Sequence, residues 1–365
     1  MFKIYSFFIL LSLPLIGCSQ TQTAFTLSDF LKKNQDLDTK VNQVFQKLSD
    51  SSRVAQLLMP AVGRLGLTKA EIDELTQKGM IGGVLMLNGT VDEFTSWIKD
   101  FEKINSKEGK LPFLYSADAE PSLVNRKIIG STPVKKAQEV KTLEEAIEVA
   151  NQISKDLTKI GINYNFAPVV DVSTNATVGY RGFGAIQENL IPWSNAFIQT
   201  TQSQNIIATA KHFPGHGVVS GDTHKSLQSI NGELKEKPNY PPLIEAGVLS
   251  IMIAHIAINN NKQYNTNGLP ATLSETIVTT LLRNEMGFNG LIVTDAMNMG
   301  GVSKVPNAAV KAVNAGCDII LMPLDTKIAY KEIWEKYISD KNFRKKVENA
   351  TKRIIRMKIC LGLIK

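Results

Sequence analysis

The distribution of apolar residues along the chain predicts a repeating β/α fold. Short apolar runs with the length of buried strands alternate with longer segments in which apolar residues recur at helical spacing. Eight such runs occur, at residues 54–62, 82–87, 111–117, 162–170, 206–210, 250–258, 290–294 and 318–322. Runs that are apolar throughout are typical of parallel strands that are covered by helices.

Two of the intervening helices have readable ends. Thr142 and Glu145 have the spacing of a capping box, an apolar face begins at Leu143, and Gly161 follows as a helix stop. A second helix is predicted from the Ser274 cap to Gly287, immediately before the seventh strand. The chain therefore alternates strand and helix, which excludes a β-sandwich.

Eight β/α units predict an α/β fold, a single-domain (β/α)8 TIM barrel over residues 34–365. The alternative is an open, doubly wound sheet, which usually carries a glycine-rich phosphate loop after its first strand. The segment Pro60-Ala61-Val62-Gly63 is not such a loop, so the barrel is favoured.

The N-terminal region predicts export and a lipid anchor. Residues 1–17 combine a lysine near the start with an apolar run, as in a secretory signal peptide, and this run is too short to span a bilayer comfortably. Leu15-Ile16-Gly17-Cys18 resembles a bacterial lipobox, which would make Cys18 the lipidated N-terminus and residues 18–33 a tether. We expect a membrane-anchored lipoprotein facing the periplasm or the cell surface. An ordinary signal peptide with an incidental cysteine is the alternative.

Composition narrows the range of partners. The chain has 41 Lys and Arg against 34 Asp and Glu, a net charge of +7, but the two signs are interspersed. No basic block is interleaved with aromatic residues, so nucleic-acid binding is not expected. Cys317 and Cys360 lie in apolar segments and are predicted to be buried thiols, neither metal ligands nor a disulfide framework.

Polar residues that could carry chemistry gather where predicted strands end. In a TIM barrel these ends form the active-site face. All four histidines lie at or just after such ends, and so do several charged residues: His212, His216, His224, His255, Asp118, Asp171, Lys211 and Asp295.

The longest of these motifs resembles a known family. Lys211-His212-Phe213-Pro214-Gly215-His216-Gly217, followed by Asp222-Thr223-His224, resembles the signature loop of the family 3 β-N-acetylglucosaminidases. Further matching segments follow the same order along the chain: Phe166–Asp171, Tyr180–Gly184, Met252–His255, Pro270–Ser274 and Thr294–Met299. The resemblance covers nearly the whole chain after the predicted tether.

The resemblance implies a retaining glycosidase. Asp295 would be the nucleophile that forms a covalent glycosyl-enzyme. His224 would serve as the acid/base, held in tautomer and orientation by Asp222, two residues away in an extended loop. One imidazole could then protonate the departing oxygen and later activate water.

The resemblance also implies how the sugar is held, without a metal or another cofactor. The hydroxyl and N-acetyl contacts map onto Asp118, Arg181, Lys211 and His212. His216 and His255 are candidates for ligand contact or for structural support, and Met252 for packing or binding. The expected partner is a glycan that contains N-acetylglucosamine, either a muropeptide or a chitooligosaccharide. No obligate protein partner is evident.

One segment departs from the family pattern. Where the family usually has Asp-Gln-Glu-Gly-Gly-Arg, this chain has Asp118-Ala119-Glu120-Pro121-Ser122-Leu123, and Arg126 follows. Proline fixes φ and removes an amide donor. The sequence therefore does not determine the path of this loop, nor whether an arginine from it contacts the ligand. We predict altered leaving-group specificity with activity retained.

Other functions remain open. A metal-dependent barrel hydrolase could use His212, His216 and Asp295, but Pro214-Gly215 excludes the helical spacing that such ligands often have. A family 3 β-glucosidase would more often have a second domain and a carboxylate acid/base. An N-acetylglucosaminide phosphorylase would use the same site with phosphate as acceptor, and a non-catalytic cell-wall-binding lipoprotein would use the same barrel.

Overall fold

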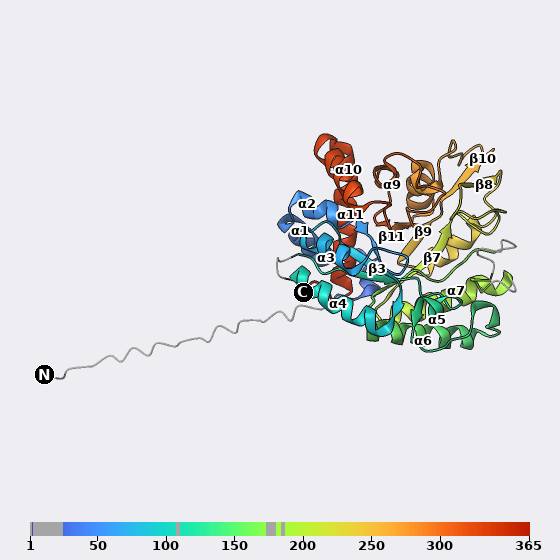
Figure 1. Ribbon diagram of the computed structural model, residues 1–365, viewed down its shortest axis with the longest axis horizontal. Coiled ribbons are helices and arrows are strands. Elements are labelled where there is room, and N and C mark those ends of the chain that lie inside the picture. The colour runs from blue at the N-terminus through green and yellow to red at the C-terminus, as the bar shows by residue number, and fades with distance from the viewer. Residues whose placement is uncertain (1, 3–24, 107–109, 173–179, 184–186) are drawn as a thin grey trace.

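The computed structural model describes residues 2, 25–106, 110–172, 180–183 and 187–365 (Figure 1). The predicted signal peptide apart from Phe2, residues 18–24 of the predicted tether including Cys18, and Gly184 lie outside the described residues. Within the described ranges, no helix has both the length and the apolar character that crossing a membrane requires.

The centre of the molecule is a curled sheet of parallel strands. Its strands follow one another in chain order, and each is hydrogen-bonded to the next. In order they are β2 (Ala61–Gly63), β3 (Gly83–Thr90), β4 (Leu114–Ala117), β6 (Tyr164–Asn165), β7 (Ile207–Phe213), β9 (Ser250–Ile253) and β11 (Leu291–Thr294). A short strand, β5 (Ile128–Ile129), pairs with β3 off this path. This is the curved parallel sheet of a TIM-barrel-like half-barrel.

Two short strands lie beside the two edges of this sheet. β1 (Leu58–Met59) pairs in parallel with β12 (Ile320–Leu321). At one edge, the Thr294 N–H of β11 donates to the Ile319 carbonyl, just before β12, at 3.0 Å. Near the other edge, the Gly82 N–H, just before β3, donates to the Leu58 carbonyl of β1 at 3.0 Å, and the Leu85 N–H of β3 donates to the Pro60 carbonyl, between β1 and β2, at 2.9 Å.

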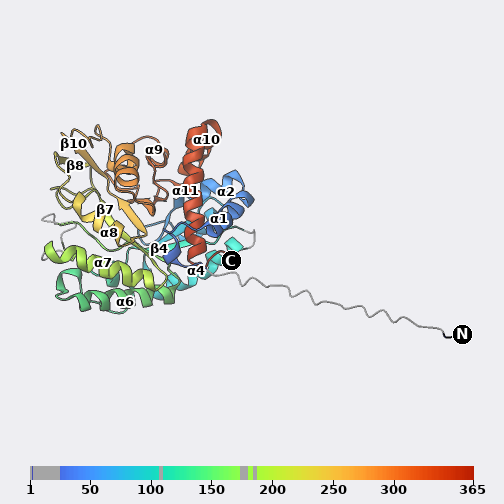
Figure 2. The same ribbon diagram turned by 180° about the vertical axis from the view of Figure 1, so that it is seen from behind.

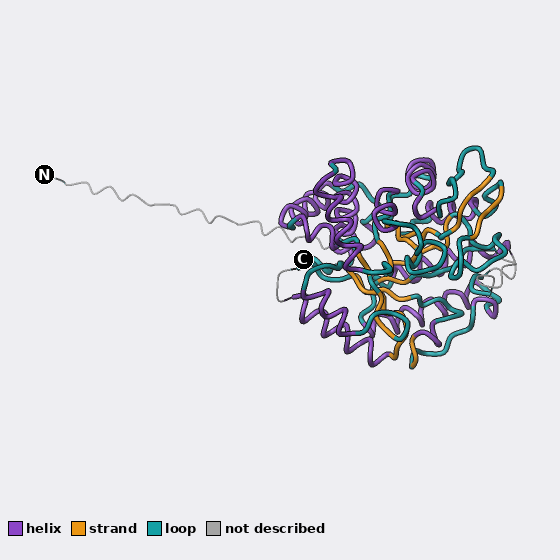
Figure 3. The backbone as a smooth tube through the Cα atoms, turned by 45° about the horizontal axis from the view of Figure 1, so that its top comes forward, coloured by secondary structure: helices purple, strands orange, loops and turns teal. Residues whose placement is uncertain are grey.

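Each of the eight predicted runs overlaps a strand, but several of their bounds differ from the observed ones, and two of these differences have a clear structural reason. Val54 and Ala55 belong to helix α2 (Asp50–Ala55), because Ser49 caps it by accepting the Ser52 N–H. The run 250–258 contains two strands, since the chain turns away after β9. Its second half, β10 (Ile256–Asn259), pairs with β8 (Gln228–Asn231) at the outer edge of the molecule (Figure 3).

Helices surround the strands on two flanks. α4, α6 and α7 lie on one flank, and α1, α2, α10 and α11 lie on the other, as the opposite views in Figures 1 and 2 agree. The α-helices not yet given are α1 (Gln35–Lys47), α3 (Lys69–Gln77), α4 (Val91–Ser106), α5 (Val124–Lys127), α6 (Leu143–Ile160), α7 (Gln187–Ser203), α8 (Tyr240–Glu245), α9 (Ala308–Ala315), α10 (Thr326–Ser339) and α11 (Lys341–Cys360). A π-helix, η5, spans Thr276–Glu285, and 3-10 turns span η1 (Leu27–Asp29), η2 (Ala137–Glu139), η3 (Lys237–Asn239) and η4 (Ala271–Leu273).

The two helices with predicted ends are present. The Thr142 side chain accepts the Glu145 N–H at 3.2 Å, and Gly161 ends α6 with φ +99°. Leu143 is nevertheless exposed, because the buried face of α6 begins one turn later, at Ala146. At the second helix the cap differs from the prediction: Ser274 contributes its carbonyl, not its side chain, and η5 winds with π-type bonds.

Part of the predicted tether packs against the domain. Leu27 and Phe30 are buried, and the Arg356 guanidinium of α11 donates to the Phe30 and Lys32 carbonyls, each at 2.6 Å. Cys317 and Cys360 are free thiols inside the core, as predicted.

Candidate active site

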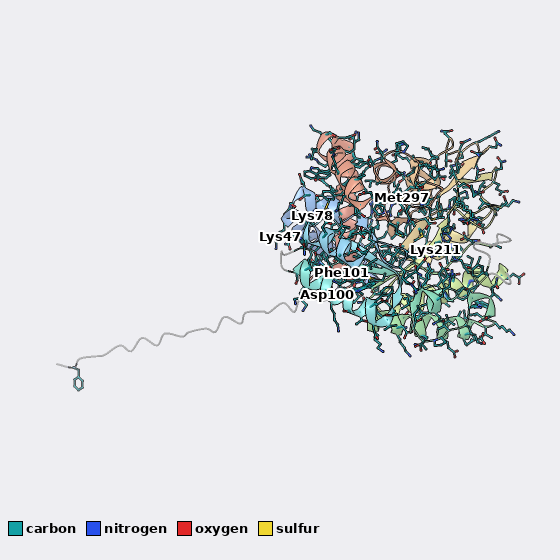
Figure 4. The ribbon with its side chains drawn as sticks, in the orientation of Figure 1. Lys47, Lys78, Asp100, Phe101, Lys211 and Met297 are labelled. Carbon is teal, nitrogen blue, oxygen red and sulfur yellow. The ribbon has the colours of Figure 1, made fainter. Side chains whose placement is uncertain are left out.

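A cavity of about 520 Å³ opens where the strands end, and most of the predicted site residues line it. Lys211 from β7 and Met297 from the loop after β11 lie within the body of the molecule, whereas Lys47 and Lys78 lie toward one side (Figure 4). The predicted residues that the cavity brings together are Asp118, Arg181, Lys211, His212, His216, His224, Met252 and Asp295.

An ion-pair cluster forms the floor of the cavity. Glu120 is fully buried, and its carboxylate accepts from Arg181 Nε at 2.8 Å and from Arg181 Nη2 at 2.6 Å. Lys211 Nζ lies 2.6 Å from the same carboxylate and also contacts Asp118. Burial disfavours the charge on Lys211, but the Asp118 and Glu120 charges outweigh it and raise the pKa of Lys211. The lysine is therefore a fixed cation.

Glu120 is a site residue that sequence reasoning missed. Burial acts to raise the pKa of its carboxyl, yet the neighbouring Arg181 and Lys211 lower it below the usual value. The anion aligns both cations toward the ligand space, so Glu120 positions them. The signal in the sequence that could have identified Glu120 is its position two residues after Asp118, at the end of a predicted strand.

Asp118 is held by two lysines. Lys127 from α5 and Lys211 each pair with one of its oxygens. Burial opposes ionisation, but the charges of Lys127, Lys211 and Arg181 hold the pKa of Asp118 well below its usual range. Asp118 is thus ionised, and its oxygens can accept further hydrogen bonds from a ligand.

The departure in the loop 119–123 has a structural outcome. Leu123 is buried where the family pattern has arginine, and Lys127 supplies a cation to Asp118. Arg126, the arginine noted in the sequence, is exposed and lines the cavity. A one-turn helix, α5, carries both side chains.

Asp171 supports the loop that contains His212 and His216, called the histidine loop below. Its carboxylate bonds His212 Nδ1 at 2.7 Å and accepts the His216 N–H at 2.8 Å. Burial acts to raise the pKa of Asp171, but the nearby His212 has the larger effect and lowers this pKa below its usual value. The carboxyl is therefore ionised. Asp171 does not line the cavity and acts through His212.

Asp295 directly follows β11 and lines the cavity. Its N–H donates to the Ile253 carbonyl at 3.0 Å, and its Oδ1 accepts the Ala296 N–H at 2.8 Å. Burial acts to raise the pKa of the Asp295 carboxyl, but His212 and the Ala296 amide outweigh it and lower the pKa. The strand end therefore presents an ionised carboxylate, as a nucleophile requires.

His224 lies at the rim of the same cavity. Its Nδ1 bonds Asp222 Oδ1 at 2.8 Å, and its N–H donates to the same oxygen at 2.9 Å. The side chain is 60% exposed, and Nε2 remains for a ligand. Burial raises the pKa of Asp222, but the bonds from His224 lower it, so an anion orients the imidazole.

His216 and His255 have different positions. His216 lines the cavity, bonds Thr223 Oγ1 through Nε2 at 2.8 Å, and has a pKa lowered by burial and by His212. His255 is fully buried and does not line the cavity. It bonds Thr272 Oγ1 at 2.8 Å and the Ala296 carbonyl at 3.0 Å, so it supports the loop after Asp295.

A second carboxylate that the sequence did not indicate braces the histidine loop. Glu236 is buried and accepts the Gly217 N–H at 2.7 Å and the Val172 N–H. Burial and the charge of Asp171 raise the pKa of Glu236 to about 8. A Cβ at Gly215 would lie 2.4 Å from the Glu236 Cβ, so the loop requires glycine there.

The histidines named for the metal-dependent alternative have other hydrogen-bond partners. Within the described residues, no three His, Cys, Asp or Glu side chains converge on a common point that could hold a metal ion. His212 and His216 instead bond Asp171 and Thr223, respectively.

Comparison with known proteins agrees with this geometry. The sequence model described as "Glycosyl hydrolase family 3 N terminal domain" matches residues 50–357. Beta-hexosaminidase A of Pseudoalteromonas piscicida is 31% identical over 290 residues, which cover 70% of this chain and 48% of that protein. A beta-hexosaminidase of Vibrio cholerae serotype O1 (strain ATCC 39541 / Classical Ogawa 395 / O395) is 29% identical over 264 residues, 69% of this chain and 78% of that protein.

A solved structure is similar over most of the chain. The glycoside hydrolase family 3 beta-N-acetylglucosaminidase of Paenibacillus sp. str. FPU-7 superposes with a TM-score of 0.79 at 27% identity. The match covers 87% of this chain and 63% of that one. The chain thus spans about half the length of the Pseudoalteromonas relative and somewhat more of the Paenibacillus enzyme.

Proposed function

Because the chain belongs to glycosyl hydrolase family 3, we propose that it is a retaining β-N-acetylglucosaminidase with Asp295 as nucleophile and His224 as acid/base. The observation that carries the proposal is that an ionised strand-end carboxylate and a carboxylate-supported histidine line one cavity. The names of the Vibrio and Paenibacillus relatives support the same activity.

The reaction proceeds in two displacements. Asp295 attacks the anomeric carbon while His224 gives its proton to the departing glycosidic oxygen, which leaves a glycosyl ester on Asp295. The neutral imidazole then takes a proton from water, the resulting hydroxide attacks the anomeric carbon, and Asp295 departs. Asp222 stabilises the imidazolium at each stage at which it forms.

The cluster at the cavity floor holds the sugar. Asp118 accepts bonds from hydroxyl groups, and Arg181, Lys211 and His212 donate to hydroxyl and N-acetyl oxygens. These charges are fixed in place before the ligand arrives, which lowers the entropic cost of orienting it.

The substrate that we propose is a terminal β-linked N-acetylglucosamine of a muropeptide or chitooligosaccharide. The enzyme is exported, and Cys18 anchors it to a membrane through lipid. The domain is a closed (β/α)8 barrel, a proposal supported by the bonds that link β12 and β1 to both edges of the curled sheet.

The decisive experiment compares wild type with Asp295→Asn on a chromogenic aryl N-acetyl-β-glucosaminide. We expect kcat to fall by roughly 10³-fold or more, because the amide cannot form the ester. Asp92→Asn, an exposed aspartate at the start of α4, is the matched control and should equal wild type. A folded wild-type protein without turnover would contradict the proposal.

The same assay distinguishes the proposed hydrolase from a β-glucosidase and from a phosphorylase. Faster turnover of the aryl glucoside than of the N-acetylglucosaminide would identify a β-glucosidase. Dependence of product formation on phosphate, with a sugar phosphate released, would identify a phosphorylase.

A further inference from the structure

The loop that carries His224 is joined by backbone hydrogen bonds to the loop that follows Asp295. The Gly300 N–H donates to the His224 carbonyl at 2.9 Å. The Gly301 N–H donates to the Thr223 carbonyl at 3.0 Å. Two adjacent amides of one loop thus fix two adjacent carbonyls of the other.

Gly300 leaves no room for a side chain, and Gly301 leaves little. A Cβ at Gly300 would lie 2.3 Å from the Lys225 carbonyl oxygen and 2.5 Å from its carbon, which are backbone atoms. At Gly301 a Cβ would lie 3.1 Å from the His255 Cβ and 3.2 Å from the Thr223 oxygen. Neither glycine has a positive φ, so the requirement is one of space, not of backbone conformation.

From the other side, a side-chain hydrogen bond between described residues also supports the same segment. Thr223 is fully buried, and its hydroxyl bonds His216 Nε2. His224 itself is largely exposed, and among the described residues its side chain bonds Asp222, which belongs to the same loop. The glycine pair therefore provides the link from the His224 loop to the element that bears Asp295.

We propose that Gly300 and Gly301 are positioning residues, a docking point that sets His224 at working distance from Asp295. The proposal rests on the function proposed above. A general acid must lie within hydrogen-bond reach of the leaving oxygen, and a misplacement of about 1 Å can cost about 100-fold in rate. An alanine at position 300 would push Lys225, and His224 with it, away from the loop after Asp295.

Substrates with different leaving groups report on this displacement. A 2,4-dinitrophenyl N-acetyl-β-glucosaminide needs little protonation, whereas N,N′-diacetylchitobiose needs a well-placed acid. For Gly300→Ala we expect kcat/KM for chitobiose to fall by about 100-fold and that for the dinitrophenyl substrate by less than about 3-fold. His224→Ala should show the same pattern. Ser303→Ala, which places an alanine in the same loop and removes only a half-buried hydroxyl, should match wild type.

A double-variant comparison excludes a merely structural effect. In the His224→Ala background, Gly300→Ala should cause no further loss on chitobiose, since the acid that it would displace is already absent. Additive losses, or equal losses on both substrates, would overturn the proposal. If thermal unfolding shows that Gly300→Ala does not fold, Gly301→Ala carries the test, because its closest contact is longer. For Gly301→Ala, kcat/KM for chitobiose should fall by about 10-fold, with kcat/KM for the dinitrophenyl substrate again changed much less.

The failure of the docking proposal is distinct from the failure of the proposed function. Wild type that hydrolyses neither substrate contradicts the glycosidase assignment. Wild type that hydrolyses both, with Gly300→Ala and Gly301→Ala folded and equal to it, contradicts only the docking role.

Discussion

At the residue scale, the cavity shows how neighbouring charges set what each side chain can do. Lys211 and Asp118 are both largely buried, and each is kept charged by the opposite charges around it, the other member of the pair among them. A buried charge without a partner would cost several kcal/mol. The cluster is therefore cooperative, and the loss of one member changes the others.

Lys127 provides a test of that cooperation. We expect Lys127→Met to raise KM for an aryl N-acetylglucosaminide by about 10-fold with kcat changed less, because Asp118 loses one charge-assisted bond. Lys127→Arg should recover most of the affinity, since it restores the cation. Lys136→Met, on an exposed lysine, is the control. Steady-state kinetics of the four proteins decide, and an unchanged KM in Lys127→Met would show that Lys127 does not assist Asp118.

At the element scale, local sequence decides where helices begin and end. α6 begins at a threonine cap and ends at a glycine with positive φ, so both ends follow from residues inside the segment. The strands depend more on their surroundings, because β6 and β12 have only two ladder residues each. Their places come from neighbouring strands, since β6 pairs with β4 and β7, and β12 pairs with β1.

The Thr142 cap can be tested separately from the active site. Thr142→Ala should lower the free energy of unfolding by about 1 kcal/mol, because the Glu145 N–H loses its acceptor. Thr142→Ser should retain most of the stability. Denaturant unfolding measures both, and kinetic constants should not change. A loss for Thr142→Ser equal to that for Thr142→Ala would argue against capping.

At the scale of the whole molecule, the last helix ties distant parts of the chain together. Arg356 of α11 holds the segment around Phe30, and Lys358 bonds Gln56 Oε1 at 2.6 Å and the Gly82 carbonyl at 3.0 Å. Lys358 is fully buried, and the described residues provide no carboxylate to pair with it. Burial lowers its pKa to about 7.

This lysine predicts a dependence of stability on pH. Between pH 7 and the ordinary lysine pKa of 10.5, the unfolded chain binds a proton at Lys358 that the folded chain does not. The free energy of unfolding should therefore increase with pH across that window, with a slope due to Lys358 that adds up to an amount on the order of a few kcal/mol. Lys358→Met should remove that slope, and Lys345→Met, on the exposed side of α11, should keep it. Chemical denaturation at pH 7, 8.5 and 10 measures the slopes, and equal slopes in all three proteins would contradict the prediction.

The sequence by itself determined the order of the elements and the chemistry at their ends. Apolar runs, caps and glycine stops act through neighbours a few residues apart, so they can be read along the chain. Because parallel strands end on one face, the positions of Asp118, Lys211 and Asp295 also placed them together. The cavity lining agrees with that expectation.

Only the tertiary structure decided which partners those residues have. Lys211 and Asp118 are 93 positions apart, and nothing local shows that Lys127, rather than Arg126, completes the cluster. Nor does spacing show that His255 lies behind the cavity, or that Gly300 and Gly301 hold the His224 loop. These contacts depend on how loops from different strands pack, and the distance between such loops is set by the whole fold.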